Sequence, residues 1–231
     1  MLEAIELTKK YNNHLVLNPL NLFVNAGEIY CLLGKKGAGK TTLLNLFTGF
    51  VQATSGEARI DGEKILPNNP SFKGILAYIP QFMMLCKDLT CFENVDFFSK
   101  LAGFSYTAKQ VENFLTEAGL SPYMRYQKIN CASIAVNQKM GLAIALARNA
   151  KILLMDDPTG WLDNEEAAEF FDLIKSFADR GKTVLMATKD IFNASNLKAR
   201  IGIMHHGSLI EEISAADINS NDLLKLYYNI I

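Results

Sequence analysis

A phosphate-binding spacing, G-x-x-x-x-G-K-[ST], occurs at Gly34-Lys35-Lys36-Gly37-Ala38-Gly39-Lys40-Thr41. Glycines in such a loop let backbone N–H groups converge on phosphate oxygens without obstruction by side chains. Lys40 is placed to reach β- and γ-phosphates, and the Thr41 hydroxyl is placed to ligate Mg²⁺. The loop directly follows an apolar run and directly precedes a helical pattern, so it predicts a nucleotide site rather than an incidental glycine-rich turn.

A second candidate element is an apolar run that ends in two acids, Ile152-Leu153-Leu154-Met155-Asp156-Asp157. As a strand of a parallel sheet, this run would place Asp156 at the carboxyl edge, where it can hold Mg²⁺ through water. Alone, the Asp-Asp-Pro sequence could equally form an Asx-type turn. Together with the phosphate loop it predicts a nucleotide site, in which Asp157 is positioned to orient or deprotonate an attacking water.

Buried strands that could carry these residues are predicted at 29–33, 75–79, 152–155 and 183–187, where the sequence is continuously apolar. We expect further strands at 2–7 and 16–24, a helix over 40–50, and a hairpin of 201–204 and 208–210 turning at His206-Gly207. The segment between 79 and 152 has helical character, as at 108–118 and 137–147. The pattern predicts an α/β fold: a parallel sheet with a helical insertion and short strands at both edges.

The amino-acid composition excludes several classes of protein. The 231 residues are 49% hydrophobic and 20% charged, which excludes a disordered chain, and the length allows one large domain or two small ones. Twenty-three Lys and Arg against 24 Asp and Glu leave none of the basic excess of a general nucleic-acid binder, so we expect no nucleic-acid partner. The four scattered cysteines favour reduced thiols. Without an apolar leader or a run of about 18 apolar residues, we expect a cytoplasmic chain that reaches a membrane only through a partner.

Further elements stand in a fixed order around the two motifs: Ala77-Tyr78-Ile79-Pro80-Gln81, Leu89-Thr90-Cys91-Phe92-Glu93-Asn94-Val95, and Asp157-Pro158-Thr159-Gly160-Trp161-Leu162-Asp163. With the gapless spacing from Ala145–Arg148 to Asp156, this set resembles the ATP-binding subunit of ABC transporters along nearly the whole chain. The resemblance implies the P-loop NTPase fold of ABC ATPases, with a mixed sheet core, an inserted helical subdomain and an antiparallel β edge. One domain is expected, with its core at 1–81 and 146–231 and its subdomain at about 82–145.

The resemblance also implies cofactors and partners. ATP and Mg²⁺ would bind the chain, two ATP-binding subunits would pair as a homo- or heterodimer, and a membrane permease would hold the chain at the inner face of the membrane. Closure of the pair and hydrolysis would drive the permease. The apolar segment 82–85 lies where the permease's coupling helix docks in the family, although a place in the subdomain core suits it equally.

Site roles follow from the resemblance, residue by residue. Tyr11 would stack on adenine and Val16 would touch it, while Gln81 would contact Mg²⁺ and the attacking water. Asp157 stands at the position of the catalytic glutamate, Lys189 at that of the switch histidine, and Ser133 in the signature that contacts the partner's nucleotide. The loop residues assigned to the phosphates are Gly34, Lys35, Lys36, Gly37, Ala38, Gly39, Lys40, Thr41 and Thr42, and those assigned to the metal are Thr41, Gln81 and Asp156.

Three of the family's motifs are altered in this sequence. The signature L-S-G-G-Q falls on Ala132-Ser133-Ile134-Ala135-Val136, where only the serine remains and Ile134 adds a branched side chain. Asp157 is one methylene shorter than glutamate, and Lys189 can attract a γ-phosphate but cannot accept a hydrogen bond as neutral histidine can. These departures predict intact ATP binding and slow hydrolysis. The alternatives are a regulatory ATP-binding subunit with negligible turnover and, disfavoured by the balanced charge, an ABC-type ATPase acting on nucleic acid or ribosomes.

Overall fold

The computed structural model describes residues 1–67, 72, 74–197 and 199–231. Its strands are β1 (Leu2–Tyr11), β2 (His14–Val24), β3 (Ile29–Leu33), β4 (Ser55–Ile60), β5 (Glu63–Lys64), β6 (Leu76–Ile79), β7 (Ile152–Asp156), β8 (Thr183–Thr188), β9 (Arg200–His205) and β10 (Ser208–Ser214). Its α-helices are α1 (Lys40–Thr48), α2 (Cys91–Leu101), α3 (Ala108–Glu117), α4 (Pro122–Arg125), α5 (Ile134–Ala147), α6 (Asn164–Asp179), α7 (Ile191–Asn196) and α8 (Ser220–Ile230), with a 3₁₀ turn at Ile129–Cys131.

The larger sheet contains all four predicted apolar strands, in the order β10-β9-β3-β8-β7-β6. Strands β9, β3, β8, β7 and β6 pair in parallel, and only the β9–β10 hairpin is antiparallel. Every residue of β3 and β8 is buried, as their continuously apolar sequences predict. Because these strands are parallel, the segments that follow β3, β6, β7 and β8 all leave the sheet at the same edge.

The N-terminal strands form a separate antiparallel sheet, in the order β2-β1-β4-β5. We expected them at the edge of the parallel sheet, and in this detail the structure differs. Leu2 and Ala4 of β1 are buried, whereas Glu3 between them is partly exposed and Ile5 is exposed. A strand with one apolar face can cover a core, whereas a strand inside the parallel sheet must bury both faces. Strands β4 and β5 lie in a polar segment that carries no such pattern.

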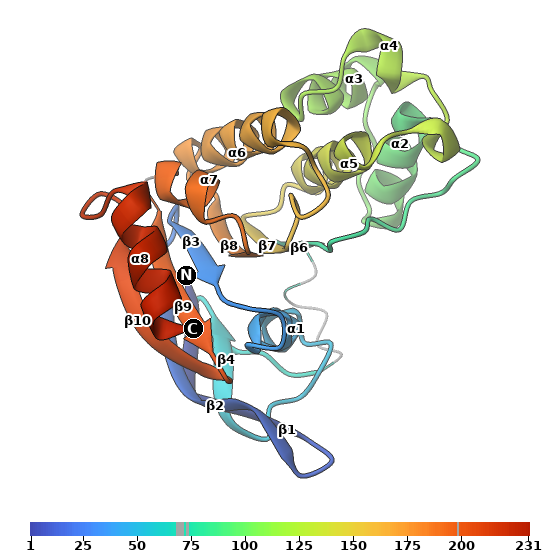
Figure 1. Cartoon of the computed structure of the whole chain (residues 1–231). Helices are drawn as coiled ribbons and strands as arrows, with labels where there is room; N and C mark the ends of the chain where they lie inside the picture. Colours follow the sequence, from blue (N-terminus) through green and yellow to red (C-terminus); the bar gives the residue numbers. More distant parts are fainter. Residues whose placement is uncertain (68–71, 73, 198) are drawn as a thin grey trace.

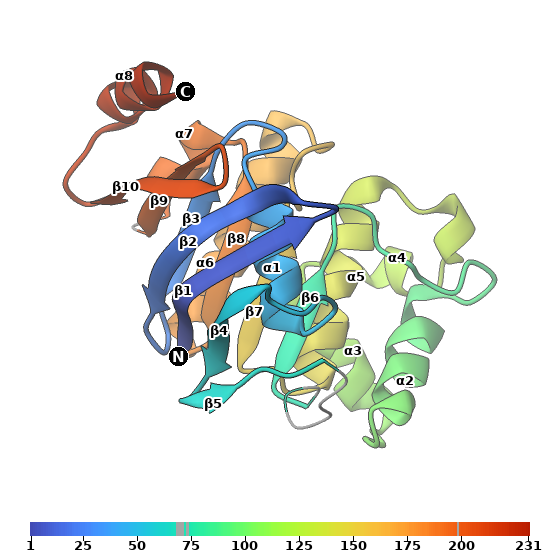
Figure 2. The ribbon, with the colours of Figure 1, turned by 90° about the horizontal axis from the view of Figure 1, so that it is seen from below.

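Helix α1 lies between the two sheets, as the view from below makes clear (Figure 2). Its side chains Leu43, Leu44 and Phe47 share one buried cluster with Tyr30 and Leu32 of β3. The alternate residues of β3 belong to a second cluster on the other face of the parallel sheet, which includes α5 and α6. Strand β3 is therefore clamped by packing on both faces, and it holds the start of α1 rigidly at the sheet edge.

The segment between β6 and β7 is helical and projects to one side of the sheets (Figure 1). Thr90 caps α2 through a reciprocal pair of hydrogen bonds with Glu93, which gives these two residues of the segment Leu89–Val95 a structural role. Asn94 of the same segment is fully buried, and its side chain forms hydrogen bonds with the backbone of Cys86, Leu89 and Thr90. This one amide therefore shapes the loop that leads from β6 into α2.

The four cysteines are free thiols, as the sequence predicts. Within the described residues, no helix combines the length and apolar character needed to cross a bilayer.

Candidate nucleotide-binding site

The predicted phosphate loop joins β3 to α1 and requires glycine at three places. Gly37 and Gly39 have φ angles of 87° and 101°, in the left-handed region that residues with a Cβ rarely adopt. A Cβ on Gly34 would lie 2.4 Å from the carbonyl oxygen of Met204. Gly39 is also the N-cap of α1 and supplies no side chain to cap its first turn. The N–H groups of that turn are therefore left to an anion in the loop.

Lys40 lies at the centre of this loop, with only 9% of its surface exposed. Its ammonium donates to the carbonyl oxygens of Gly34 at 2.5 Å and Lys35 at 3.0 Å. Burial lowers the pKa of Lys40 from its usual value, whereas Asp157 and Asp156 act in the opposite direction. Both acceptors of the Lys40 ammonium are neutral carbonyl groups, so its positive charge remains available to bind a phosphate in the loop.

Thr41 and Asp156, which are 115 positions apart in the sequence, meet beside Lys40. The Thr41 hydroxyl donates to Asp156 Oδ2 at 2.8 Å. Burial raises the pKa of Asp156, because the carboxylate loses hydration that Lys40 and Thr41 replace only in part. A hydroxyl and a carboxylate are the hard oxygen ligands that Mg²⁺ prefers, so this pair fits the predicted metal.

Asp157 follows β7 in a left-handed conformation, with φ of 48°, and its backbone N–H donates to the Ala187 carbonyl at 2.8 Å. Its carboxylate oxygen Oδ2 accepts from the Lys189 ammonium at 2.6 Å and from the Gln81 side chain at 3.1 Å. A Cβ on Gly160 would lie 2.5 Å from the same oxygen. Glycine at 160 therefore leaves the space that the buried carboxylate occupies between its two donors.

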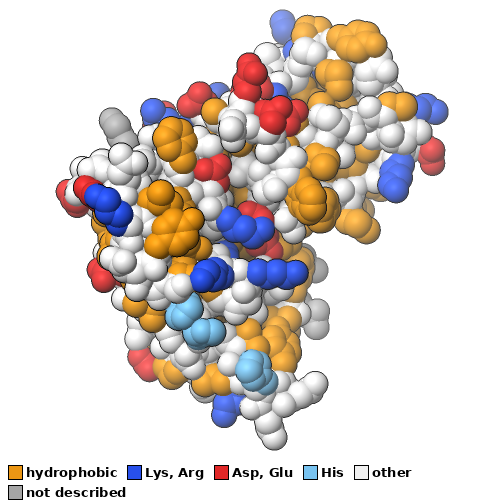
Figure 3. All heavy atoms as spheres, viewed as in Figure 1, with side chains coloured by type: hydrophobic (Ala, Val, Ile, Leu, Met, Phe, Trp, Pro, Cys, Tyr) orange, Lys and Arg blue, Asp and Glu red, His pale blue; other side chains and the backbone are white. Residues whose placement is uncertain are grey.

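These residues surround one cavity of about 390 Å³ at the carboxyl edge of the parallel sheet. It is lined by Val16, Lys36, Gly37, Ala38, Gly39, Lys40, Thr41, Thr42, Gln81, Asp156, Asp157, Trp161 and Lys189. Figure 3 shows Lys and Arg side chains gathered near the middle of this face, with Asp and Glu between them. The cavity therefore brings together the predicted phosphate, metal and acid residues, with a local cationic surplus in a nearly neutral chain.

Trp161 is the lining residue that sequence reasoning did not assign to the site. Its ring lies 5.9 Å, centroid to centroid, from the ring of Phe82, which directly follows Gln81. The sequence signal was present, because Trp161 stands four positions after Asp157. Its contact with Phe82 depends on the fold, which brings the loop after β7 next to the segment after β6.

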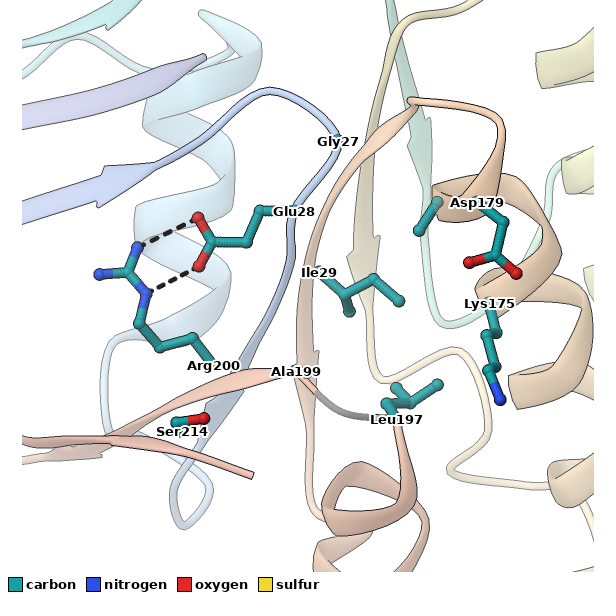
Figure 4. Close-up of a pocket in the computed structure, with 10 residues that line it drawn as sticks. Gly27, Glu28, Ile29, Lys175, Asp179, Leu197, Ala199, Arg200 and Ser214 are labelled. Carbon is teal, nitrogen blue, oxygen red and sulfur yellow. Dashed lines mark hydrogen bonds and ion pairs between the residues drawn. The ribbon is translucent and has the colours of Figure 1, made fainter. Parts of the chain in front are cut away.

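A second cavity, of about 430 Å³, lies at the amino end of β3 between α6 and β9 (Figure 4). Its charged lining residues include the ion pair of Glu28 with Arg200. Glu28 faces Arg200, which donates to the carboxylate at 2.8 Å and also contacts Glu212 and the carbonyl of Phe23. Lys175 and Asp179 of α6 also line the cavity, beside apolar residues such as Ile29, so its two cations are balanced by two carboxylates and it has no cationic surplus like that of the first cavity.

Comparison with known proteins decides the family. The family described as "ABC transporter" matches residues 17–160, which is more than half of the chain. The chain belongs to the ABC transporter family. Bacitracin transport ATP-binding protein BcrA of Bacillus licheniformis is 30% identical over 214 residues, which cover 92% of this chain and 69% of BcrA. Lantibiotic transport ATP-binding protein SrtF of Streptococcus pyogenes is 28% identical, covering 92% of this chain and 90% of SrtF.

Other relatives are longer or share mainly the fold. Ribose import ATP-binding protein RbsA of Yersinia pestis is 28% identical over 98% of this chain, which spans only 46% of RbsA. The ATP-binding cassette MJ0796, solved as a dimer bound to ADP and phosphate, superposes with a TM-score of 0.82 at 28% identity, covering 93% of this chain and 99% of that cassette. The cbiO1 cassette of Clostridium perfringens reaches 0.86 at 22% identity, covering 99% and 94%. The α/β fold of an ABC ATPase is thus confirmed.

Two residues with family-derived roles lie outside the lining of the cavity. Tyr11 ends β1 with 41% of its surface exposed, and the Lys9 ammonium lies 4.8 Å from the centre of its ring. Ser133 is the N-cap of α5, and its hydroxyl accepts from the backbone N–H of Val136 at 3.3 Å. The adenine contact of Tyr11 and the partner contact of Ser133 therefore stay predictions.

Lys35 also differs from its neighbours in the loop. Its carbonyl holds Lys40, while its own ammonium donates to the carbonyl oxygen of Ile231 at 2.8 Å. Its contribution to the phosphate loop is therefore through the backbone, and its side chain ties the loop to the residue that follows α8.

Proposed function

We propose that this chain is an ATP-binding subunit of an ABC transporter, which binds Mg-ATP in the 390 Å³ cavity and hydrolyses it slowly. The observation that carries the proposal is the meeting of Lys40, Thr41 and Asp156 at a glycine-rich helix start, at the carboxyl edge of the sheet. This is the arrangement that nucleotide-binding α/β sheets use.

Binding would rest on groups that are already in place. The backbone N–H groups of 37–41 and the Lys40 ammonium would hold the β- and γ-phosphates. Thr41, Asp156 and Gln81 are the residues proposed to hold Mg²⁺, which when bound would neutralise part of the phosphate charge. Val16 lines the cavity and would touch the base.

Hydrolysis would use Asp157 as the general base. Asp157 takes a proton from a water whose oxygen bonds to the γ-phosphorus, while the bond from that phosphorus to ADP breaks. The carboxylate first has to exchange its 2.6 Å contact with Lys189 for the water. The γ-phosphate is the competing anion, so Lys189 is proposed to turn toward it when ATP binds.

The second candidate is a regulatory subunit with negligible turnover. Two observations favour it: the acid is already paired with Lys189, and Ile134 exposes 38% of its surface where the family has a glycine. The Ile134 side chain, at the start of α5, would weaken the closure of α5 over the ATP of a partner subunit. Both candidates share the same ATP-binding cavity and differ only in the rate of the chemical step.

We further propose a permease and a second ATP-binding subunit as partners, with the chain at the cytoplasmic face of the membrane. The names of BcrA and SrtF, which are transport ATP-binding proteins, and the dimeric MJ0796 structure support this. In the segment 82–85, Phe82 and Met84 are 55% and 88% exposed, whereas Met83 and Leu85 pack against the core. The segment thus has one face in the subdomain core and one available to a permease.

The division into a core, 1–81 and 146–231, and a subdomain at about 82–145 belongs to the same proposal.

Calorimetric titration of ATP with and without Mg²⁺ tests the proposal. Wild type is expected to bind ATP more tightly with Mg²⁺, and Thr41→Val is expected to lose that gain because it removes only the hydroxyl. Thr48→Val, at the far end of α1, makes the same exchange away from the cavity and should retain the gain. Absence of ATP binding in wild type, or a full Mg²⁺ effect in Thr41→Val, would overturn the assignment.

A further inference from the structure

The segment after β6 has no regular structure, yet it must hold the Gln81 side chain in place. A single side chain, Gln138 of α5, bonds its backbone on both sides of the Pro80–Gln81 junction. The Gln138 amide nitrogen donates to the Gln81 carbonyl at 2.7 Å and to the Pro80 carbonyl at 3.2 Å. Both amide hydrogens are thus used on two consecutive carbonyl groups that no strand or helix pairs.

Helix α5 lies directly against both ends of this segment. A Cβ on Gly141 would be 3.2 Å from Ile79 Cγ2 and 3.2 Å from the sulfur of Met83. Gly141 is in the middle of a helix, where glycine is otherwise unfavourable, so the close approach is what it provides. The segment from Ile79 to Met83 is therefore held by a tight contact at each end and by Gln138 between them.

The amide of Gln138 is only partly satisfied. The side chain is 1% exposed, and its oxygen Oε1 has no hydrogen-bond partner among the described residues. An unpaired buried carbonyl oxygen is unfavourable, and an apolar side chain of the same length would avoid it. Packing alone therefore does not favour glutamine at this position, whereas its two donated hydrogen bonds do.

The segment that Gln138 holds leads directly to the proposed base. The side chain of Gln81 donates to Asp157 Oδ2 at 3.1 Å, and the next residue, Phe82, carries the ring beside Trp161. We infer that Gln138 is a positioning residue, which fixes the backbone at Pro80 and Gln81 so that the Gln81 amide reaches Asp157 and the metal site. This inference rests on the proposed function for its catalytic consequence.

Gln138→Met is the test, because methionine has the same length and no donor. Gln127→Met is the matched control, at a half-buried position in the bend between α4 and the 3₁₀ turn, where the side chain lies outside the contacts described above. Trp161 is the only tryptophan, so its emission in the nucleotide-free protein reports the Phe82 contact without any bound ligand. The further measurements are thermal unfolding, the gain in ATP affinity from Mg²⁺, and ATP turnover.

We expect Gln138→Met to unfold at the same temperature as wild type or higher, to change the Trp161 emission and to lose the Mg²⁺-dependent gain in affinity. Turnover should fall by about 10- to 100-fold, the range expected when a catalytic group is displaced by about 1 Å. Gln81→Ala should have the same effects on affinity and turnover, and adding Gln138→Met to it should reduce neither further. If Gln138→Met fails to fold, Gln138→Asn, which withdraws the amide by one methylene, should alter the same readouts.

Wild-type emission together with a wild-type Mg²⁺ effect in Gln138→Met would overturn the inference. Additive losses in the Gln81→Ala background would do the same, because they would mean that Gln138 acts elsewhere. Failure of the wild-type protein to bind ATP would instead contradict the proposed function. The emission comparison would then still decide whether Gln138 holds the segment.

Discussion

Two helix starts in this molecule differ in what fills their first turn. Helix α1 begins after Gly39, which has a φ of 101° and no side chain to offer. Helix α5 begins after Ser133, whose φ is −69° and whose hydroxyl accepts from the N–H of Val136. Both helices carry the partial positive charge of an N-terminus, and the resemblance to the family predicts a phosphate contact at each of them.

The difference teaches that an anion site depends on which N–H groups are open and on what surrounds them. At α1 the open N–H groups meet the buried ammonium of Lys40 in a cavity. At α5 one N–H is already taken, and Ile134 projects where a glycine would leave room. In a dimer, each ATP would lie between the α1 site of one chain and the α5 start of the other. We therefore expect this chain to bind its own ATP well at α1, and to contact a partner's ATP only weakly through α5.

Lys40→Ala should have the largest effect, because it removes the ammonium at the centre of the α1 site. The affinity for ATP should fall on the order of 10²-fold or more, as expected for loss of a charge-assisted contact. Calorimetry measures this, with Lys175→Ala, which lines the second cavity, as the control. Undiminished affinity in Lys40→Ala would contradict the assignment of the phosphate loop.

Asp157→Glu should have the next largest effect if reach limits the chemical step. The added methylene should raise turnover by about 10-fold, within the range that a well-placed general base contributes. A phosphate-release assay on the purified chain measures it. An unchanged rate, with ATP affinity retained, would shift the cause of slow turnover to Lys189 or to the α5 start.

How much of the site was predictable depends on whether its parts are local in sequence. The loop 34–41 and the strand ending at Asp156 are continuous segments, so their spacing sufficed. The ion pair of Asp157 with Lys189 joins the ends of two strands, and the Thr41 contact with Asp156 spans 115 positions. Predicting those contacts required the order β3-β8-β7, which no local pattern contains.

The same limit applies to the fold. The parallel strands were predicted because burial on both faces leaves an unbroken apolar run, and the hairpin turn at His206-Gly207 is confirmed. The separate β2-β1-β4-β5 sheet was not predicted, since the alternation in β1 indicates one buried face but not its partner strand. The contact of Gln138 with the Pro80–Gln81 backbone was not predicted, because a glutamine within an apolar helix has no sequence signal for the backbone it bonds.

Lys189→Met should have a smaller effect that depends on the nucleotide. The affinity for ATP should fall about 5-fold, equivalent to about 1 kcal/mol, which is modest because the ammonium is more than half exposed. The affinity for ADP should stay unchanged, since only ATP presents a γ-phosphate to Lys189. Parallel calorimetric titrations with ATP and ADP check this, and equal losses for both would place Lys189 away from the γ-phosphate.

Ser133→Ala should have the smallest effect on ATP, because α5 is not part of this chain's own cavity. The variant should lose about 1 kcal/mol of unfolding free energy through loss of the N-cap, measured in denaturant. Its ATP affinity should equal that of wild type. Weaker ATP binding by the isolated Ser133→Ala chain would mean that the α5 start contributes to its own nucleotide, and the contrast with α1 would fail.

The most direct test of the account is to measure Mg-ATP binding and hydrolysis on the same sample of wild type and of Asp157→Asn. The account predicts that both proteins bind ATP with similar affinity, that wild type hydrolyses it slowly, and that Asp157→Asn does not. Binding without wild-type turnover would contradict slow hydrolysis and support the regulatory alternative. Absence of binding, or equal turnover in the two proteins, would contradict the roles proposed for the cavity and for Asp157.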